Sequence, residues 1–237
     1  MRLAERLAGQ HLLLTGVTGF VGQALLERVL ADLPGTRVSV LVRGRPGASA
    51  EDRVRALLDG PAFAPLRARD GAVHALLGAR LSVVDADLGA PLPQLPGDVD
   101  VVVHCAGEVS FDPPVDEGFR TNVDGTLALL TALRDSGARP HVVHVSTAYV
   151  AGLRSGWVPE ARHQHDVDWR AESAAAQALA PRADVDSRAP DVLAELLAQA
   201  REARGAAGPQ AVAVEAERLR RRWVRTRLVQ AGRERAR

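Results

Sequence analysis

Short apolar runs alternate with longer amphipathic stretches over the first 150 residues of the chain. Five of these runs have the length and the Val- and Leu-rich composition of buried strands. They are residues 11–15 (HLLLT), 38–42 (VSVLV), 81–84 (LSVV), 99–104 (VDVVVH) and 142–145 (VVHV). Strands separated by helical segments form parallel sheets through βαβ units. The pattern therefore predicts an α/β fold with a doubly wound parallel sheet of about five strands, which binds ligands outside the carboxyl ends of its strands.

The segments between the strands carry helical spacing and helix-boundary signals. Apolar residues recur every four positions over residues 21–33, and a Pro-Gly pair ends that helix. Ser49, with Asp52 three positions later, has the form of a capping box that opens a second helix. A third helix, ending near Gly137, is expected to bury one face. That face consists of Phe119, Val123, Leu127 and Leu130.

The pattern changes at about residue 161, after which no strand-like run recurs. Residues 170–237 read as helix, with an interruption at residues 205–209. We predict a first domain over residues 1–160, which holds the sheet, and a charged helical segment over residues 161–237. A chain that ends in a helix, without a cap or a Gly/Pro stop, is expected to be part of a longer domain.

The C-terminal segment is also distinct in charge. Residues 201–237 hold 11 arginines against four acidic residues. An apolar stripe of Leu219, Trp223 and Leu228 is expected to face protein, with the arginines on the solvated side. The alternative is that the arginines contact acidic lipid, CoA phosphates or nucleic acid. We expect no nucleic-acid partner, and peripheral contact with a membrane stays open.

Composition removes several classes of chemistry. All 30 positive charges are arginine, so a lysine Schiff base, a P-loop lysine and a Tyr-x-x-x-Lys pair are excluded within these 237 residues. Tyr149 is the single tyrosine and Cys105 the single cysteine. One cysteine cannot form an internal disulfide, which favours a reducing, cytoplasmic location. No run approaches the roughly 18 apolar residues of a membrane span, and the first ten residues lack the apolar core of a secretory signal.

The strongest chemical signal is the glycine-rich stretch TGVTGFVG, which follows the first strand and opens a helix. In that context, Gly16 permits a tight turn, Gly19 lets the backbone approach a pyrophosphate and Gly22 allows close helix packing. The helix N-terminus then offers N–H groups and a positive dipole end to the anion. The alternative is a glycine-rich turn without a ligand. The predicted cofactor contacts in this loop are Gly16, Thr18, Gly19, Phe20, Val21 and Gly22.

The residue that ends the second strand discriminates between two dinucleotides. An acid about 20 residues beyond the glycines bonds the ribose of NAD, whereas an arginine accommodates the 2′-phosphate of NADP. Here that position holds Arg43, followed by Arg45. This favours NADPH, unless both arginines are ordinary solvated loop residues.

Three further strand ends carry candidate residues. Asp87 and Leu88 follow the third strand, where a carboxylate can accept from an adenine amino group. Ala106 and Gly107 follow the fourth, where small residues let the backbone pass near a ribose. Both sites could equally be ordinary turns, and Cys105 between strand and turn is expected to be a small buried residue without activation.

The fifth strand ends in Ser146 and Thr147. A hydroxyl at this place can donate to a substrate carbonyl oxygen as negative charge develops on it. The alternative is that both hydroxyls bond the local backbone.

A polar cluster of His163, His165, Asp166 and Asp168 could be drawn as a set of metal ligands. Short polar clusters in loops rarely bind metal, so no metal is expected.

Several motifs in order resemble a known family. TGVTGFVG, the arginine at position 43, HCAGEVSF, TNVDGT at residues 121–126 and HVSTAYV at residues 144–150 are similar to the extended short-chain dehydrogenase/reductases. More narrowly, they resemble the fatty acyl-CoA reductase and thioester-reductase branch, including its male-sterility-like members. The resemblance covers nearly the whole chain.

The resemblance implies a Rossmann-like fold and NADPH-dependent reduction of a fatty acyl-CoA, or of a carrier-bound acyl thioester, to an aldehyde or alcohol. By motif, the three glycines hold the pyrophosphate, Arg43 the 2′-phosphate, and Asp87 with Leu88 the adenine region. Ala106 and Gly107 line the ribose. Thr147, or less favourably Ser146, orients the carbonyl, and Asn122 serves as a helix-kink and water-relay residue.

One departure from the family is central. Its general acid is the tyrosine of Tyr-x-x-x-Lys, whose pKa the lysine lowers. Tyr149 is followed four positions later by Leu153, so it belongs to the fifth-strand motif instead. The chain is expected to be the cofactor-binding portion of a reductase, with activity depressed by about 10²–10⁴. The alternatives are a non-catalytic NADP-binding module, or an extended epimerase or dehydratase acting on nucleotide sugars.

Overall fold

A computed structural model describes residues 3–71, 73–152, 154–161 and 166–235. The chain forms two compact units. The first comprises Met1–Gly107 and Asp124–Gln164, and the second Glu108–Val123 and His165–Arg237. The boundary predicted from the sequence, between residues 160 and 161, differs from the limits of these units, because residues 108–123 group with the C-terminal helices. As a domain boundary it stays a prediction.

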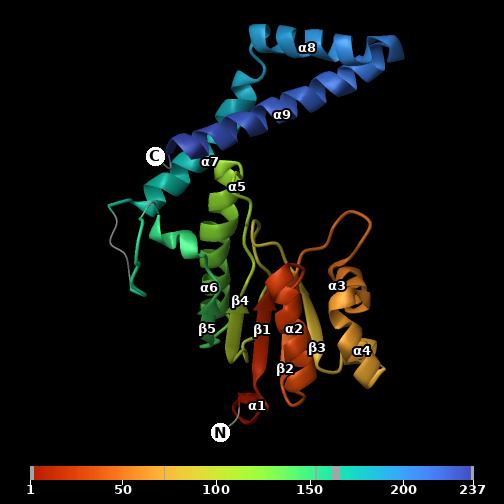
Figure 1. The fold of residues 1–237 in the computed structure, drawn as a ribbon, viewed down its shortest axis with the longest axis vertical. Coiled ribbons are helices and arrows are strands. Elements are labelled where there is room, and N and C mark those ends of the chain that lie inside the picture. Colours follow the sequence, from red (N-terminus) through yellow and green to blue (C-terminus); the bar gives the residue numbers. More distant parts are fainter. Residues whose placement is uncertain (1–2, 72, 153, 162–165, 236–237) are drawn as a thin grey trace. The chain divides into compact units, whose positions relative to one another are not determined.

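The first unit is built on a five-stranded sheet in which every neighbouring pair is parallel (Figure 1). The strand order is β3-β2-β1-β4-β5. The doubly wound α/β fold is thus confirmed, and each expected strand is present to within two residues. The strands are β1 (His11–Thr15), β2 (Arg37–Val42), β3 (Leu81–Asp85), β4 (Val101–His104) and β5 (His141–His144).

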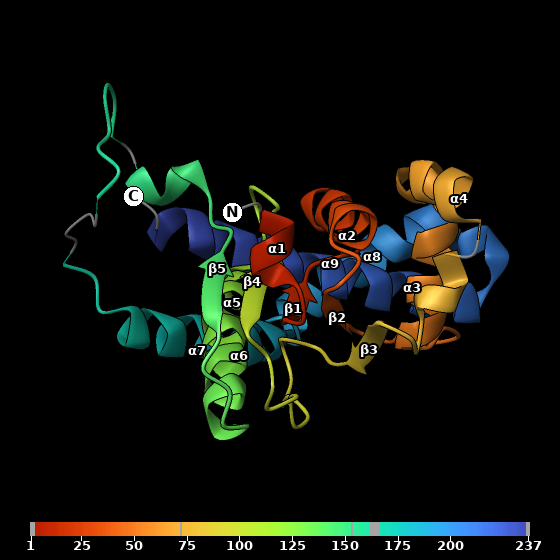
Figure 2. The ribbon, with the colours of Figure 1, turned by 90° about the horizontal axis from the view of Figure 1, so that it is seen from below.

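Helices of this unit cover both faces of the sheet (Figure 2). Leu12 and Leu14 of β1 pack with the apolar faces of α2 and α3, whereas Leu13, which points the other way, packs with α6. All three leucines are buried, which explains why a strand buried on both faces reads as a continuous apolar run. The helices are α1 (Leu3–Leu7), α2 (Phe20–Asp32), α3 (Ala50–Asp59), α4 (Ala64–Asp70) and α6 (Gly125–Asp135), with short 3₁₀ turns at Pro61–Phe63, Val73–Leu76 and Ala148–Ala151.

The start of α3 confirms the predicted capping box. The Ser49 hydroxyl accepts from the Asp52 N–H at 3.0 Å, and the Asp52 carboxylate accepts from the Ser49 N–H at 3.0 Å. This exchange satisfies two N–H groups that the first helical turn leaves without partners.

The predicted buried face of the third helix is wrong. Leu127 and Leu130 are each 41% exposed, whereas Leu129 and Leu133 are buried. The reason is a π-helical segment, Arg120–Asp124, between α5 (Val115–Phe119) and α6. A π turn takes up one residue more than an α turn, so an uninterrupted helical count from Phe119 points to the wrong side of α6.

The second unit is helical, as the sequence pattern predicted. Besides α5, it contains α7 (Trp169–Asp186), α8 (Pro190–Arg204), a 3₁₀ turn at Gly205–Ala207 and α9 (Pro209–Arg235). Leu228 of α9 is buried, and Leu219 and Trp223 are half-buried, so the expected apolar stripe is confirmed.

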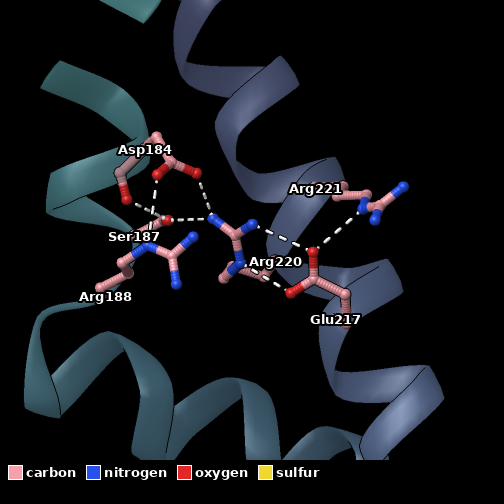
Figure 3. A network of polar contacts seen from close by, with 6 residues as sticks. All are labelled: Asp184, Ser187, Arg188, Glu217, Arg220 and Arg221. Atoms are coloured by element: carbon pink, nitrogen blue, oxygen red, sulfur yellow. Dashed lines mark hydrogen bonds and ion pairs between the residues drawn. The ribbon is translucent and has the colours of Figure 1, made fainter. Parts of the chain in front are cut away.

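One arginine of α9 contradicts the expectation of a solvated arginine face. The Arg220 side chain is only 11% exposed and lies against the end of α7 (Figure 3). It donates to Asp184 at 2.5 Å, to the Ser187 hydroxyl at 2.8 Å and to Glu217 at 2.8 Å. These hydrogen bonds raise the pKa of Arg220, and those from Arg220 and Arg221 lower the pKa of Glu217 to about 2.

Candidate functional site

Gly16, in the loop between β1 and α2, and Gly22, in the first turn of α2, both lie where a Cβ atom would clash with the backbone. Gly16 has φ +73°, and a Cβ atom on it would lie 2.5 Å from the carbonyl carbon of Cys105. A Cβ on Gly22 would lie 2.2 Å from the Gly16 carbonyl oxygen. The Gly19 N–H donates to that same oxygen at 2.9 Å. The loop is therefore folded tightly against both the first turn of α2 and the segment that follows β4.

The outer side of this loop is open to solvent. Gly19 is the N-cap of α2 and has no side chain to bond the first helical N–H groups. Thr18 is exposed, Phe20 is 92% exposed and Val21 is 54% exposed. A helix N-terminus that is capped by glycine and bordered by exposed residues suits an anion, because its N–H groups point outward.

A buried hydrogen-bond relay fixes the segment after β4 against β1. The Thr15 hydroxyl oxygen lies 2.6 Å from Nδ1 of His104 and accepts from the Ala106 N–H at 3.2 Å. Nε2 of His104 lies 3.0 Å from the Thr126 hydroxyl on α6. Since His104 is 1% exposed, burial lowers its pKa to about 4, with repulsion from His144 as a smaller cause.

This relay predicts a loss of stability in mild acid. An unfolded histidine takes up a proton near pH 6.5, whereas folded His104 resists protonation down to about pH 4. The unfolded state therefore binds more protons in this window, and stability falls as the pH drops through it by as much as about 3 kcal/mol. Urea unfolding between pH 7 and pH 4 measures how steeply the free energy of unfolding falls as the pH is lowered. This slope should be shallower in His104→Gln. A His141→Gln control removes an exposed histidine and should retain the pH dependence. Equal slopes in wild type and His104→Gln would contradict the assignment.

Arginines gather at the carboxyl ends of β2 and β3. Arg43 pairs with Asp87 at 2.9 Å, and the Arg53 guanidinium donates to the Arg43 carbonyl. Burial and repulsion from Arg45 and Arg43 lower the pKa of Arg53, so the three positive charges lie near one another. The adjoining Leu88 is buried.

A hollow of about 720 Å³ opens at this place. Its lining residues come from the loops that follow β2 and β3: Arg43, Gly44, Arg45, Pro46, Gly47, Ala48, Ser49, Asp85, Ala86, Asp87, Pro91 and Pro93. Two arginines line this open hollow beside Asp85 and Asp87, and a guanidinium group can bind a phosphate that stays in contact with water.

The segment after β5 brings two hydroxyls to the same edge of the sheet. Ser146 and Thr147 follow the strand, and both are exposed. The Thr147 hydroxyl accepts from the Tyr149 N–H at 3.2 Å, which is the local backbone bond that the alternative interpretation predicted. An accepting hydroxyl oxygen can still donate its own proton, so this bond does not prevent donation to a ligand.

Asn122 lies in the second unit, on the π-helical segment. Its side-chain oxygen accepts from the Glu108 N–H at 2.7 Å, and its side-chain nitrogen donates to the Glu108 carbonyl at 3.1 Å. Both partners belong to this unit, so Asn122 holds the start of the 108–114 loop. All other predicted site residues lie in the first unit, after the carboxyl ends of five parallel strands.

Sequence reasoning missed Thr15, Arg53 and the buried role of His104. Thr15 and His104 are the last residues of β1 and β4 and are register partners in the sheet, which becomes visible only when the strand order is known. Arg53 had a signal: it lies in the first turn of the helix that the capping box opens, just beyond the loop that carries Arg43 and Arg45.

The polar cluster considered as a metal site is only partly described. Asp168 caps α7 by accepting from the Arg170 N–H at 2.9 Å, whereas His163 and His165 lie outside the described residues. Within the described ranges, three or more potential ligands never gather at one place. Burial also raises the pKa of the Cys105 thiol, which makes it a poorer nucleophile.

The sequence pattern of the NAD-binding family described as "Male sterility protein" matches residues 14–204 of the chain. The chain belongs to this family. Membership of this family confirms the resemblance found in the sequence motifs. It also supports a nicotinamide dinucleotide as the cofactor of the chain.

Curated relatives agree with this placement. Fatty acyl-CoA reductase 1 of Xenopus laevis is 32% identical over 154 residues, which are 63% of this chain and 30% of that protein. Fatty acyl-CoA reductase 2 of Homo sapiens is 28% identical over 152 residues, with shares of 62% and 30%. The matched region thus spans less than a third of these relatives.

Solved structures show the same fold. The terminal R domain from the myxalamid PKS-NRPS biosynthetic pathway superposes with a TM-score of 0.54 at 27% identity, over 73% of this chain and 45% of that one. A thiolation-reductase di-domain from an archaeal non-ribosomal peptide synthetase has a TM-score of 0.50 at 22% identity, over 76% of this chain and 39% of that one. Among the described residues of this family member, none of the helices is long and apolar enough to cross a membrane.

Proposed function

We propose that this chain is the NADPH-binding portion of a reductase that converts a fatty acyl-CoA, or a carrier-bound acyl thioester, to an aldehyde or alcohol. The observation that carries the proposal is the tightly folded glycine loop at the carboxyl edge of the sheet, in a chain of an NAD-binding family. The names of its relatives, fatty acyl-CoA reductases and a reductase di-domain with a thiolation partner, support the substrate class.

The residues present fit a dinucleotide. Gly16 and Gly22 allow the tight fold of the loop, since a Cβ atom at either position would collide with the backbone, and the exposed N-terminus of α2 suits a pyrophosphate. In the proposal, the hollow beside Arg43, with Arg45 and Arg53 nearby, receives the 2′-phosphate. Asp87 and Leu88 border the adenine. Ala106 and Gly107, which the Thr15 relay holds in place, border a ribose.

NADPH, when bound, supplies a hydride to the substrate carbonyl. The chain's own contribution is to orient that carbonyl: the Thr147 hydroxyl, with Ser146 beside it, donates to the oxygen on which negative charge develops. With no lysine in the chain and Tyr149 outside a Tyr-x-x-x-Lys spacing, these residues supply no lysine-assisted general acid. Turnover by the chain alone should therefore be depressed by about 10²–10⁴ relative to a complete reductase.

Cofactor titration tests the proposal. NADPH should bind in the micromolar range and more tightly than NADH; binding of both weaker than millimolar would refute the glycine-loop assignment. Arg43→Asp should weaken NADPH selectively, and Arg43→Gln should do the same without placing a second carboxylate beside Asp87. We expect about tenfold, the size of one lost charge-assisted contact. An Arg37→Gln control alters the amino end of β2 and should leave both affinities unchanged, whereas equal losses for NADPH and NADH at position 43 would contradict the 2′-phosphate role.

The missing lysine favours a second candidate, a non-catalytic module that binds NADP as a ligand. Both candidates require the cofactor titration to succeed, so turnover separates them. NADPH oxidation that depends on added acyl-CoA, and that falls in Thr147→Val, supports the reductase. Tight NADPH binding with no acyl-dependent oxidation, in an assay sensitive enough to detect a rate depressed by about 10⁴, supports the module.

A further inference from the structure

An apolar pocket of about 370 Å³ lies within the second unit, between α5 and the C-terminal turns of α9. Its apolar lining is Phe111, Pro113, Val115, Phe119, Val123 and Val229. The helices meet closely here, since a Cβ atom on Gly232 would lie 3.3 Å from that of Val115. The volume falls within the roughly 300–1,000 Å³ of small-molecule sites.

The mouth of this pocket is polar. Arg233 of α9 and Asp112 form a two-pronged ion pair, with both N–O distances at 2.7 Å. The pair keeps the charge of Arg233 balanced beside an apolar lining, and Phe111 next to it is 85% exposed. An apolar side chain left largely in water at a pocket mouth is a feature of ligand sites.

A second hollow of about 670 Å³ adjoins the first and shares Val229 and Arg233 with it. It follows one face of α9, where Arg222 and Arg225 precede the shared residues at helical spacing. Glu234 also lines it, beside Arg222, Arg225 and Arg233, the last of which is already paired with Asp112. Arg225 keeps a long ion pair with Glu117, at 3.7 Å.

We propose that the two hollows together bind the acyl thioester: the acyl chain enters the apolar pocket, and a phosphate of the thioester's carrier group lies on Arg222 and Arg225. This rests on the proposed function, whose substrate is apolar at one end and phosphate-bearing at the other. An apolar pocket joined to an arginine groove matches both ends. The family match ends at residue 204, so the wall that α9 provides lies outside the region that the family defines.

Free acyl-CoA and an acyl group on a carrier's phosphopantetheine share this chemistry. Calorimetric titration of the full chain should use dodecanoyl-CoA, dodecanoyl-phosphopantetheine, CoA and dodecanoate. Burial of about two methylene groups already gives about tenfold in affinity, so dodecanoyl-CoA should bind at least tenfold more tightly than CoA. Equal binding of the two would overturn the apolar pocket. If dodecanoyl-phosphopantetheine binds as tightly as dodecanoyl-CoA, the single phosphate suffices and carrier-bound substrates are included; weaker binding assigns the site to CoA.

Variants test the two hollows separately. Gly118→Leu fills the pocket, and a Cβ there lies at an ordinary 3.6 Å from Pro113. This variant should bind dodecanoyl-CoA no more tightly than CoA. The control is Gly205→Leu, where a Cβ has open space, and it should keep the higher affinity for dodecanoyl-CoA. Phe111→Ala, at an exposed position, serves the same purpose if Gly118→Leu does not fold, with an expected loss of about fivefold.

The groove is tested by Arg222→Gln with Arg225→Gln, against Arg221→Gln on the same helix outside both hollows. The double variant should weaken CoA and dodecanoyl-CoA alike by about tenfold and flatten their salt dependence. Unchanged affinities would overturn the phosphate site. NADPH affinity, measured in parallel, keeps the two proposals apart: if NADPH binds but none of these variants matters, only the thioester site fails.

Discussion

Gly22→Ala is expected to abolish measurable NADPH binding and to destabilise the first unit by about 1–3 kcal/mol. The added methyl group would lie 2.2 Å from the Gly16 oxygen, 2.6 Å from its carbon and 2.8 Å from the Val17 Cα. All three atoms belong to the backbone, so the clash can be relieved only by displacing the loop that forms the proposed pyrophosphate site. Calorimetric titration with NADPH and urea unfolding measure the two effects.

Two further alanine variants separate packing from ligand binding. Gly19 has an extended backbone, and a Cβ on it meets only the Gly16 oxygen, at 3.3 Å. Gly19→Ala should therefore lower the free energy of unfolding by no more than about 1 kcal/mol, the scale of an N-cap change. It should nevertheless weaken NADPH binding at least fivefold, because the methyl group would lie in the proposed pyrophosphate site. Gly35→Ala, with ordinary 3.6 Å contacts at the other end of α2, should change neither quantity. Wild-type NADPH affinity in both Gly19→Ala and Gly22→Ala would exclude this loop as the cofactor site.

Arg220→Ala is expected to lower the melting temperature of the helical unit by about 5 °C or more. The side chain is only 11% exposed and holds Asp184, Ser187 and Glu217 together, so its removal leaves two carboxylates without their strongest partner. Both carboxylates keep contact with water, which limits the loss. Because Trp157 belongs to the first unit, tryptophan fluorescence in a Trp157→Phe background follows the helical unit through Trp169 and Trp223.

The neighbouring Arg221 is the matched control. It pairs with the same Glu217 at 3.0 Å, but its side chain is 78% exposed, so Arg221→Ala should shift the melting temperature by no more than about 1 °C. Arg220→Lys should lie between the two, because an ammonium group cannot reach three partners in the plane of a guanidinium. Equal shifts for Arg220→Ala and Arg221→Ala would show that burial of Arg220 carries no stability.

The elements that local pattern specifies were predictable. A strand buried on both faces is a run of apolar residues whatever surrounds it, and the capping box at Ser49 is complete within four residues. The same holds for the glycine loop, because positive φ at Gly16 and the contact between Gly22 and Gly16 arise within seven residues. Their interpretation as a cofactor site nevertheless remains a proposal.

Features that depend on distant contacts or on a local change of helix type were not predictable. The π segment before α6 shifted the buried face to Leu129 and Leu133, because helical spacing is counted on the assumption of an uninterrupted α-helix. The pairing of Arg43 with Asp87 needed β2 and β3 to be neighbours in the sheet. The apolar pocket needed residues 111–123 and 229–233 to meet across more than 100 positions.

By itself, the sequence determined the parallel α/β architecture, the glycine loop with its arginine at the second strand end, and the absence of lysine chemistry within these residues. Periodicity and the steric limits of the backbone can be read from short stretches of sequence, and composition from residue counts alone. Tertiary structure alone decided which arginine of α9 is buried, which hydroxyls hold His104 and where an apolar pocket forms. Those outcomes depend on which side chains are buried when helices and strands pack against one another. The order of residues within a single helix or strand does not specify that packing.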